Sequence, residues 1–175
     1  MKKSIVIRRV KAFVIDYVII LIYAILLLGA SLLISKLFHL DINNINPVAG
    51  ELIGFVTLTL PVILYFTLSE NSSYGGTIGK RKFRLRVIKK DGTRVGLLRL
   101  LIRNIIKFFP WELAHFFIYR LINFTSTGDQ APGFVLTGLI LSQALAVIYF
   151  ACILLTKNNR SIYEWLSGTM VIQNP

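Results

Sequence analysis

Apolar residues gather along this chain into four long runs that are separated by short polar segments. The runs cover residues 12–34, 48–68, 104–124 and 133–155. Each is about as long as the roughly 20 helical residues that cross a bilayer core of about 30 Å. The pattern therefore predicts an all-α integral membrane protein with four transmembrane helices in a single domain.

The third run is the least apolar of the four, because polar residues interrupt it. These residues are Lys107, Pro110, Glu112, His115 and Arg120. Two interpretations are open: a membrane span with one polar face, or a helix that lies in the membrane interface. We expect a span, because that choice agrees with the distribution of charge described next.

Basic residues predict the orientation of these helices. The chain has 20 Lys and Arg against 8 Asp and Glu, and a formal net charge of +12. With four spans and an inner N-terminus, 18 basic residues fall on the inner side and two, Lys36 and Arg120, on the outer side. Cytoplasmic segments of membrane proteins carry an excess of Lys and Arg. We therefore expect both termini inside, with short outer connections at residues 39–47 and 125–132.

The inner loop, residues 69–103, alternates basic and apolar residues. The apolar Phe83, Leu85 and Val87 would share one face, and Asp91-Gly92 is typical of a hairpin turn. We expect a short basic β-hairpin on the inner membrane surface with its apolar face toward the membrane. An amphipathic helix over residues 97–109 would follow it.

The same loop predicts contact with anionic lipids of the cytoplasmic leaflet, each charge contributing about 1 kcal/mol. A docking surface for a partner protein is the alternative, and binding of nucleic acid is not expected. The candidate lipid-facing residues are Lys80, Arg81, Lys82, Arg84, Arg86, Lys89 and Lys90.

Composition argues against several other classes of protein. Hydrophobic residues make up 55% of the chain and the mean hydropathy is +0.67, which is not typical of a soluble enzyme. A single cysteine, Cys152, excludes an intrachain disulfide. The spacings of a zinc site, a Ser–His–Asp set, an HExxH helix and a P-loop are all missing. We expect neither enzymatic activity nor a cofactor or metal.

A few acidic residues lie where a carboxylate needs an explanation. Asp16 lies inside the first apolar run, where an unpaired carboxylate is costly. Arg9 precedes it by two helical turns and so faces the same side, which predicts an ion pair between them. The pair would be structural, or Asp16 would exchange a proton or a cation.

Two further pairs are predicted from helical spacing. Arg160 and Glu164 stand four residues apart and would face each other if their segment is helical, with Gly168 as the helix C-cap. Glu112 and His115 stand three residues apart, and His115 could relay protons near neutral pH. A structural role for each pair is the alternative.

Three segments of the sequence resemble the RDD family of bacterial membrane proteins, which is named for one Arg and two Asp residues. They are RRVKAFVIDYVII, SSYGGTIGKRKFRLRVIKKDGTRVG and RSIYEWLSGTMVI. By this resemblance the family's Arg falls on Arg9 and its first Asp on Asp16, while the second Asp is replaced by Glu164 and a preceding His by Tyr163. The family's later Arg-Asn is Arg103-Asn104.

The resemblance covers a single transmembrane domain over roughly residues 4–172, implies a multi-pass protein of the bacterial cytoplasmic membrane and allows cation/proton antiport. Asp16 and Glu164 would then be the ion-coupling residues, followed by Glu112 and His115, with Arg9, Arg160 and Arg103 as ion-pair partners. Four short spans are a small scaffold for transport, so a homo-oligomer or a larger membrane-protein complex is expected. The alternative function is a non-transporting accessory or assembly subunit of such a complex.

Overall fold

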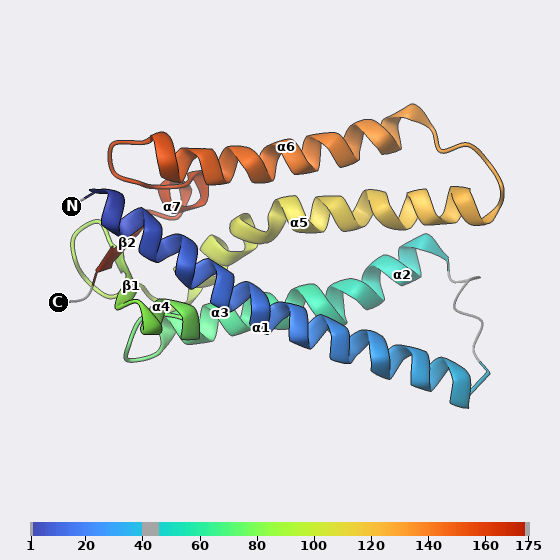
Figure 1. The fold of residues 1–175 in the computed structure, drawn as a ribbon, viewed down its shortest axis with the longest axis horizontal. Coiled ribbons are helices and arrows are strands. Elements are labelled where there is room, and N and C mark those ends of the chain that lie inside the picture. The colour runs from blue at the N-terminus through green and yellow to red at the C-terminus, as the bar shows by residue number, and fades with distance from the viewer. Residues whose placement is uncertain (1, 40–45, 174–175) are drawn as a thin grey trace. The chain divides into compact units, whose positions relative to one another are not determined.

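The structure, a computed structural model, describes residues 2–39 and 46–173 and is mainly helical (Figure 1). Most of the predicted outer connection at residues 39–47 lies outside the described residues. The elements in chain order are α1 (Lys2–Leu37), α2 (Pro47–Gly54), the π-helix η2 (Phe55–Thr59), α3 (Leu60–Asn71), α4 (Ile78–Lys82), β1 (Leu85–Lys89), α5 (Leu97–Ser126), α6 (Gly133–Leu155), α7 (Ile162–Leu166) and β2 (Thr169–Gln173).

Each of the four predicted apolar runs lies in a helical stretch. Three stretches of the described chain are long and apolar enough to cross a membrane, namely Ile5–Leu37, Pro47–Asn71 and Gly133–Leu155. Helix α5 contains the third predicted run and, because of its charged residues, is not among them. The helices are therefore confirmed, and three membrane-spanning candidates are found where four were expected.

The second apolar stretch contains a π-helix that ends two residues before Pro61. Proline has no N–H, so it cannot donate to the carbonyl oxygen four residues earlier. That oxygen belongs to Thr57, and the hydroxyl of Tyr23 donates to it at 2.5 Å. A side chain of the first stretch thus supplies a donor to a carbonyl oxygen beside the proline, and such hydrogen bonds help membrane helices to tolerate proline.

The chain divides into two compact units. The first unit comprises residues 1–20, 62–108 and 147–175, and the second comprises residues 21–61 and 109–146. Within the first unit, α4, β1, β2 and α7 gather near the N-terminal turns of α1 (Figure 1). Its apolar core is formed by Ala12, Leu85, Val87, Val95, Leu100 and Val171.

The sheet differs from the predicted hairpin. Strand β1 pairs antiparallel with the C-terminal strand β2, in a register from Leu85 opposite Gln173 to Lys89 opposite Thr169. The turn at Asp91-Gly92 forms, but the chain beyond it makes only the isolated bridge of Arg94 to Ile88. The prediction of a hairpin was wrong. Helix α5 begins at Leu97, so the few residues between the turn and the helix cannot form a second strand.

The predicted orientation of β1 was also wrong. Leu85 and Val87 are buried in the core of the first unit, against Leu100 and Val171, rather than turned toward a membrane surface. Four buried aliphatic side chains from β1, α5 and β2 therefore hold this small sheet onto the helices. The alternation of apolar and basic residues correctly predicted a strand with one apolar face, but this face packs against the protein core and not against a membrane.

Candidate functional site

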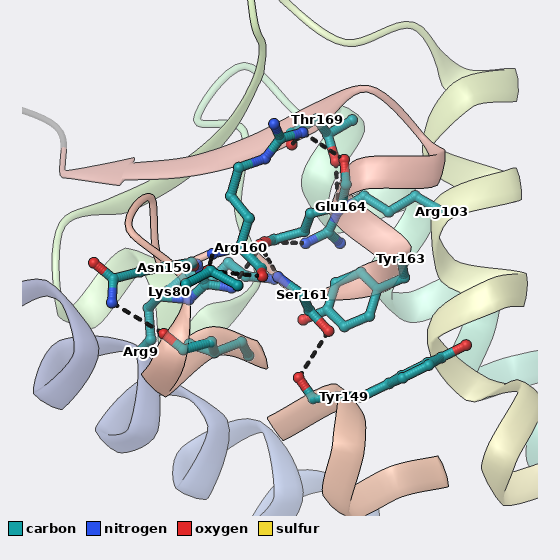
Figure 2. A network of polar contacts seen from close by, with 12 residues as sticks. Arg9, Lys80, Arg103, Tyr149, Asn159, Arg160, Ser161, Tyr163, Glu164 and Thr169 are labelled. Atoms are coloured by element: carbon teal, nitrogen blue, oxygen red, sulfur yellow. Dashed lines mark hydrogen bonds and ion pairs between the residues drawn. The ribbon is translucent and has the colours of Figure 1, made fainter. Parts of the chain in front are cut away.

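The centre of the first unit is the buried side chain of Arg103 on α5. One guanidinium nitrogen, Nη1, donates to both carboxylate oxygens of Glu70 at 3.0 and 2.8 Å. The other, Nη2, lies 3.4 Å from Oε1 of Glu164, and Nε donates to the hydroxyl of Thr169 at 3.2 Å. Figure 2 shows Arg103 close to Glu164, Thr169 and Tyr163. One cation therefore joins α3, α5, α7 and β2.

Glu164 is fully buried at the start of α7. Its Oε1 accepts a hydrogen bond from Nη2 of Arg9 at 2.8 Å, and its Oε2 accepts one from the backbone N–H of Ser161 at 3.0 Å. The second bond is part of a capping box, which satisfies backbone donors at the helix start. Arg9 also donates to the carbonyl oxygen of Asn159 (Figure 2). The predicted pair of Arg9 with Asp16 was therefore wrong, because Arg9 is committed to Glu164.

Arg160 is buried but does not pair with the carboxylate of Glu164. Its Nη2 donates to the carbonyl oxygens of Glu164 and Thr169, at 2.8 and 2.7 Å. The predicted i,i+4 pair required a helix through Arg160, whereas α7 begins two residues later at Ile162. Gly168 does follow the helix with a positive φ of 66°, as expected for a residue that ends it.

Glu70, at the end of α3, is a buried carboxylate that the sequence analysis missed. It pairs with Lys80 and Arg103 and accepts a hydrogen bond from Nδ2 of Asn104 at 3.3 Å. Glu70 follows the second apolar run and so resembled a loop residue. The signal that could have found it is helical spacing, because Phe66 and Thr67, one turn earlier, are buried on the same face. Lys80 is correspondingly buried, and is not a lipid-facing residue.

We call these five charged residues, Arg9, Glu70, Lys80, Arg103 and Glu164, the ion-pair cluster. They include three cations and two carboxylates, and both carboxylates are fully buried. Tyr163 lies beneath Arg103, with the guanidinium carbon 5.1 Å from the ring centroid. Burial raises the pKa of the Tyr163 phenol, and the nearby Glu164 carboxylate raises it further, so the phenol is neutral at physiological pH.

Asp16 of α1 is buried at a separate point of the first unit and is bound by neutral donors. Its carboxylate accepts hydrogen bonds from the hydroxyl of Thr77 at 2.6 Å, the backbone N–H of Gly79 at 2.9 Å and the hydroxyl of Tyr65 at 3.1 Å. Thr77 also caps α4. Residues 77–80, the start of α4, thus fold into a short turn whose hydrogen-bond donors hold the carboxylate of Asp16. No Lys or Arg of the described chain forms an ion pair with it.

Glycine at position 79 allows this approach. A Cβ added there would lie 2.2 Å from the carbonyl oxygen of Ala12 and 3.0 Å from the carboxyl carbon of Asp16. Both Ala12 and Asp16 are buried on α1. The small side chain of Ala12 and the absence of a side chain at Gly79 therefore let α4 touch the backbone of α1, which brings the Gly79 N–H within reach of Asp16.

The second unit holds the predicted pair of Glu112 and His115 on α5. Glu112 Oε2 accepts a hydrogen bond from the hydroxyl of Thr59 at 2.6 Å and lies 3.6 Å from Nδ1 of His115. That distance is too long for a hydrogen bond, and Nδ1 is buried without one. In the same unit Arg120 pairs with Glu51 at 2.9 Å. Glu112 and His115 are adjacent as predicted, and both remain partly exposed.

The remaining basic residues of the inner loop differ in exposure. Arg81, Lys82, Arg84 and Lys90 are exposed, whereas Arg86 and Lys89 are partly covered. The part of the chain that the structure describes contains no group of three His, Cys, Asp or Glu residues able to hold a metal ion.

Comparison with known proteins identifies the family. The sequence profile of the RDD family matches residues 4–168, nearly the whole chain, so the protein belongs to the RDD family. No curated protein and no solved structure matches it.

The close contact at Gly79 predicts that Gly79→Ala destabilises the protein. The added methyl would force α4 away from α1 and lengthen the hydrogen bond to Asp16, so we expect the free energy of unfolding to fall by about 2 kcal/mol. Thermal unfolding in detergent measures the change. Gly96→Ala is the matched control, because a Cβ at Gly96 meets no atom within 4 Å. Equal melting temperatures for the two variants would contradict the tight contact.

The ion-pair cluster predicts that Glu70→Gln destabilises the protein strongly. The substitution removes the charge that balances Lys80 and Arg103 in a buried site, and breaking a buried pair costs about 3 kcal/mol or more. Thermal unfolding of the same preparation is the measurement, with the exposed Asp129→Asn as the control. An unchanged melting temperature for Glu70→Gln would show that the cluster does not contribute to stability.

Proposed function

We propose that this RDD-family protein is a multi-pass membrane protein that acts as a non-transporting accessory or assembly subunit of a larger membrane complex. One observation carries the proposal: both carboxylates that the family resemblance marks for ion coupling, Asp16 and Glu164, are buried and fully engaged by protein groups. Both carboxylates are therefore built into the fold of the first unit.

The energetics support this choice over transport at those residues. An exchanging carboxylate must release its ligands to accept a cation or a proton. Asp16 would lose three hydrogen bonds, and a hydrogen bond to a charged group contributes about 1.5–3 kcal/mol. Glu164 would leave Arg9 and Arg103 uncompensated in a buried site. Repeated exchange at either residue would therefore disrupt the first unit.

We place the protein in the bacterial cytoplasmic membrane with four spans and both termini inside, with α5 as the third span. At 1.5 Å per residue the 30 residues of α5 extend about 45 Å, longer than a bilayer core. Its charged Glu112 and Arg120 have partners in Thr59 and Glu51, which reduces the cost of burying them in a membrane. The distribution of 18 inner and two outer basic residues supports the orientation.

The basic inner loop is then the surface that contacts anionic lipid and partner proteins. Its exposed residues Arg81, Lys82, Arg84 and Lys90 are available for both. We propose no enzymatic activity, cofactor or nucleic-acid partner, and we expect a homo-oligomer or a complex with another membrane protein.

The proposal predicts a stoichiometric partner and no ion transport. We expect the protein, purified from its native membrane in a mild detergent, to retain a second membrane protein or a further copy of itself. Everted vesicles containing it should show no proton movement on addition of Na⁺ or K⁺, and Asp16→Asn should leave that result unchanged. Purification as a monomer together with a cation-dependent proton signal would refute the proposal.

A second candidate function, cation/proton exchange, is favoured by the second unit. There Glu112 is bound by a threonine hydroxyl rather than by Arg or Lys, and Nδ1 of His115 has no hydrogen bond. Such a carboxylate and imidazole could change protonation without disrupting a buried ion pair.

This candidate predicts that Glu112→Gln abolishes any cation-dependent proton signal in everted vesicles, whereas Asp129→Asn, which changes an exposed acid of the same unit, leaves it intact. His115→Gln should shift the pH at which the signal is half-maximal. A signal that persists in Glu112→Gln would exclude this residue as the exchanging group.

A further inference from the structure

A groove of about 730 Å³ lies in the first unit beside the start of α5 and the end of α7. Apolar side chains from both helices line it, together with two basic side chains, Lys89 and Arg99, and with Gly96, Ser167 and Gly168. The apolar residues are Leu97, Leu98, Ile102, Trp165 and Leu166. None of these residues belongs to the ion-pair cluster or to the contacts of Asp16.

The charge of this groove is positive. No Asp or Glu lines it, and neither Lys89 nor Arg99 has an ion pair among residues 2–39 and 46–173. Asp91 is an acid close enough to interact with both cations, and the hydroxyl and backbone N–H of Thr93 donate to it at 2.6 and 2.8 Å. Those hydrogen bonds, together with Lys89 and Arg99, lower the pKa of Asp91. An anion entering the groove would therefore meet two cations that have no acid of the described chain within ion-pair distance, although the ionised Asp91 offsets part of their charge.

The apolar lining is open rather than part of the protein core. Leu98 is 71% exposed, Trp165 50% and Leu166 67%, whereas Leu100 on the other side of α5 is completely buried. Exposed apolar side chains at Leu98, Ile102 and Ile105 follow one another at helical spacing along α5. An open tryptophan beside a basic rim is typical of a membrane interface, where the aromatic ring lies at the level of the headgroups.

We propose that this groove binds one anionic phospholipid, with the lipid phosphate between Lys89 and Arg99 and the upper acyl chains against Leu98, Trp165 and Leu166. The charge and the apolar lining together favour this occupant. An Arg guanidinium suits a phosphate because it offers paired donors, and the open leucines suit a hydrocarbon chain. This proposal rests on the proposed function, which places the inner loop at the membrane. It assigns the binding of anionic lipid to one groove and not to the whole basic surface of the loop.

The site predicts lipid-selective quenching of Trp165. The chain has two tryptophans, so Trp111→Phe leaves Trp165 as the only one. This variant is placed in phosphatidylcholine nanodiscs that contain a minor fraction of acyl-brominated phosphatidylglycerol or, for comparison, the same fraction of acyl-brominated phosphatidylcholine. We expect stronger quenching by the brominated phosphatidylglycerol. Because a hydrogen bond from a charged group to the phosphate is worth more than diffuse attraction to the surface, Arg99→Gln and Lys89→Gln should each reduce the preference by about ten-fold.

Lys90→Gln is the matched control, because Lys90 is exposed next to Lys89 but does not line the groove. An equal loss of preference in Lys90→Gln, Lys89→Gln and Arg99→Gln would overturn the site and leave only diffuse attraction. No preference in the parent variant would also overturn it. Native mass spectrometry of the wild-type protein provides an independent measurement, in which retained phosphatidylglycerol should decrease with Arg99→Gln and not with Lys90→Gln.

These outcomes are distinct from those that test the accessory function. A lost lipid preference with a retained protein partner would refute the groove and keep the accessory function. A retained preference without any partner would refute the accessory function and keep the groove.

Discussion

The first unit depends on the buried pairing of Arg103 with Glu70 and Glu164. A guanidinium removed from water needs carboxylates placed around it, and here they come from the end of α3 and the start of α7. Each carboxylate also pairs with a second cation: Glu70 with Lys80, and Glu164 with Arg9. Since buried ion pairs add little net stability when complete and cost much when broken, the main effect of this pairing is to select one arrangement of α1, α3, α4, α5, α7 and strand β2.

The other features of the first unit follow from that arrangement. With Arg9 held by Glu164, the N-terminal turns of α1 lie against α4, where Ala12 and Gly79 touch and Asp16 receives its three hydrogen bonds. With Thr169 bonded to Arg103, the last strand begins beside α5 and pairs with β1. The groove beside Trp165 is a further consequence. The end of α7, with Trp165 and Leu166, lies beside the start of α5, with Leu97 and Leu98, and these residues line the groove together.

Acidic and basic residues therefore have different uses in this protein. In the first unit the buried acids Asp16, Glu70 and Glu164 organise the fold, which makes them poor candidates for exchange chemistry. The less constrained acid is Glu112 of the second unit, beside His115. Most of the exposed basic residues remain available for interactions with other molecules. This availability supports the proposed accessory function over transport at Asp16.

The sequence by itself determined the long helices, the family and the adjacent pair of Glu112 and His115. Helical membrane segments and i,i+3 neighbours depend only on residues close together in the chain, so local patterns suffice. Tertiary structure alone decided which charges meet: Arg9 and Glu164 are 155 residues apart, and β1 finds its partner at the C-terminus rather than across its own turn. Glu70 was missed for the same reason, because its partners come from α4 and α5. The burial and pairing of a charged side chain depend on distant segments that the fold brings next to it. Periodicity in the sequence reflects only neighbours within one helix or strand, so it cannot predict such contacts.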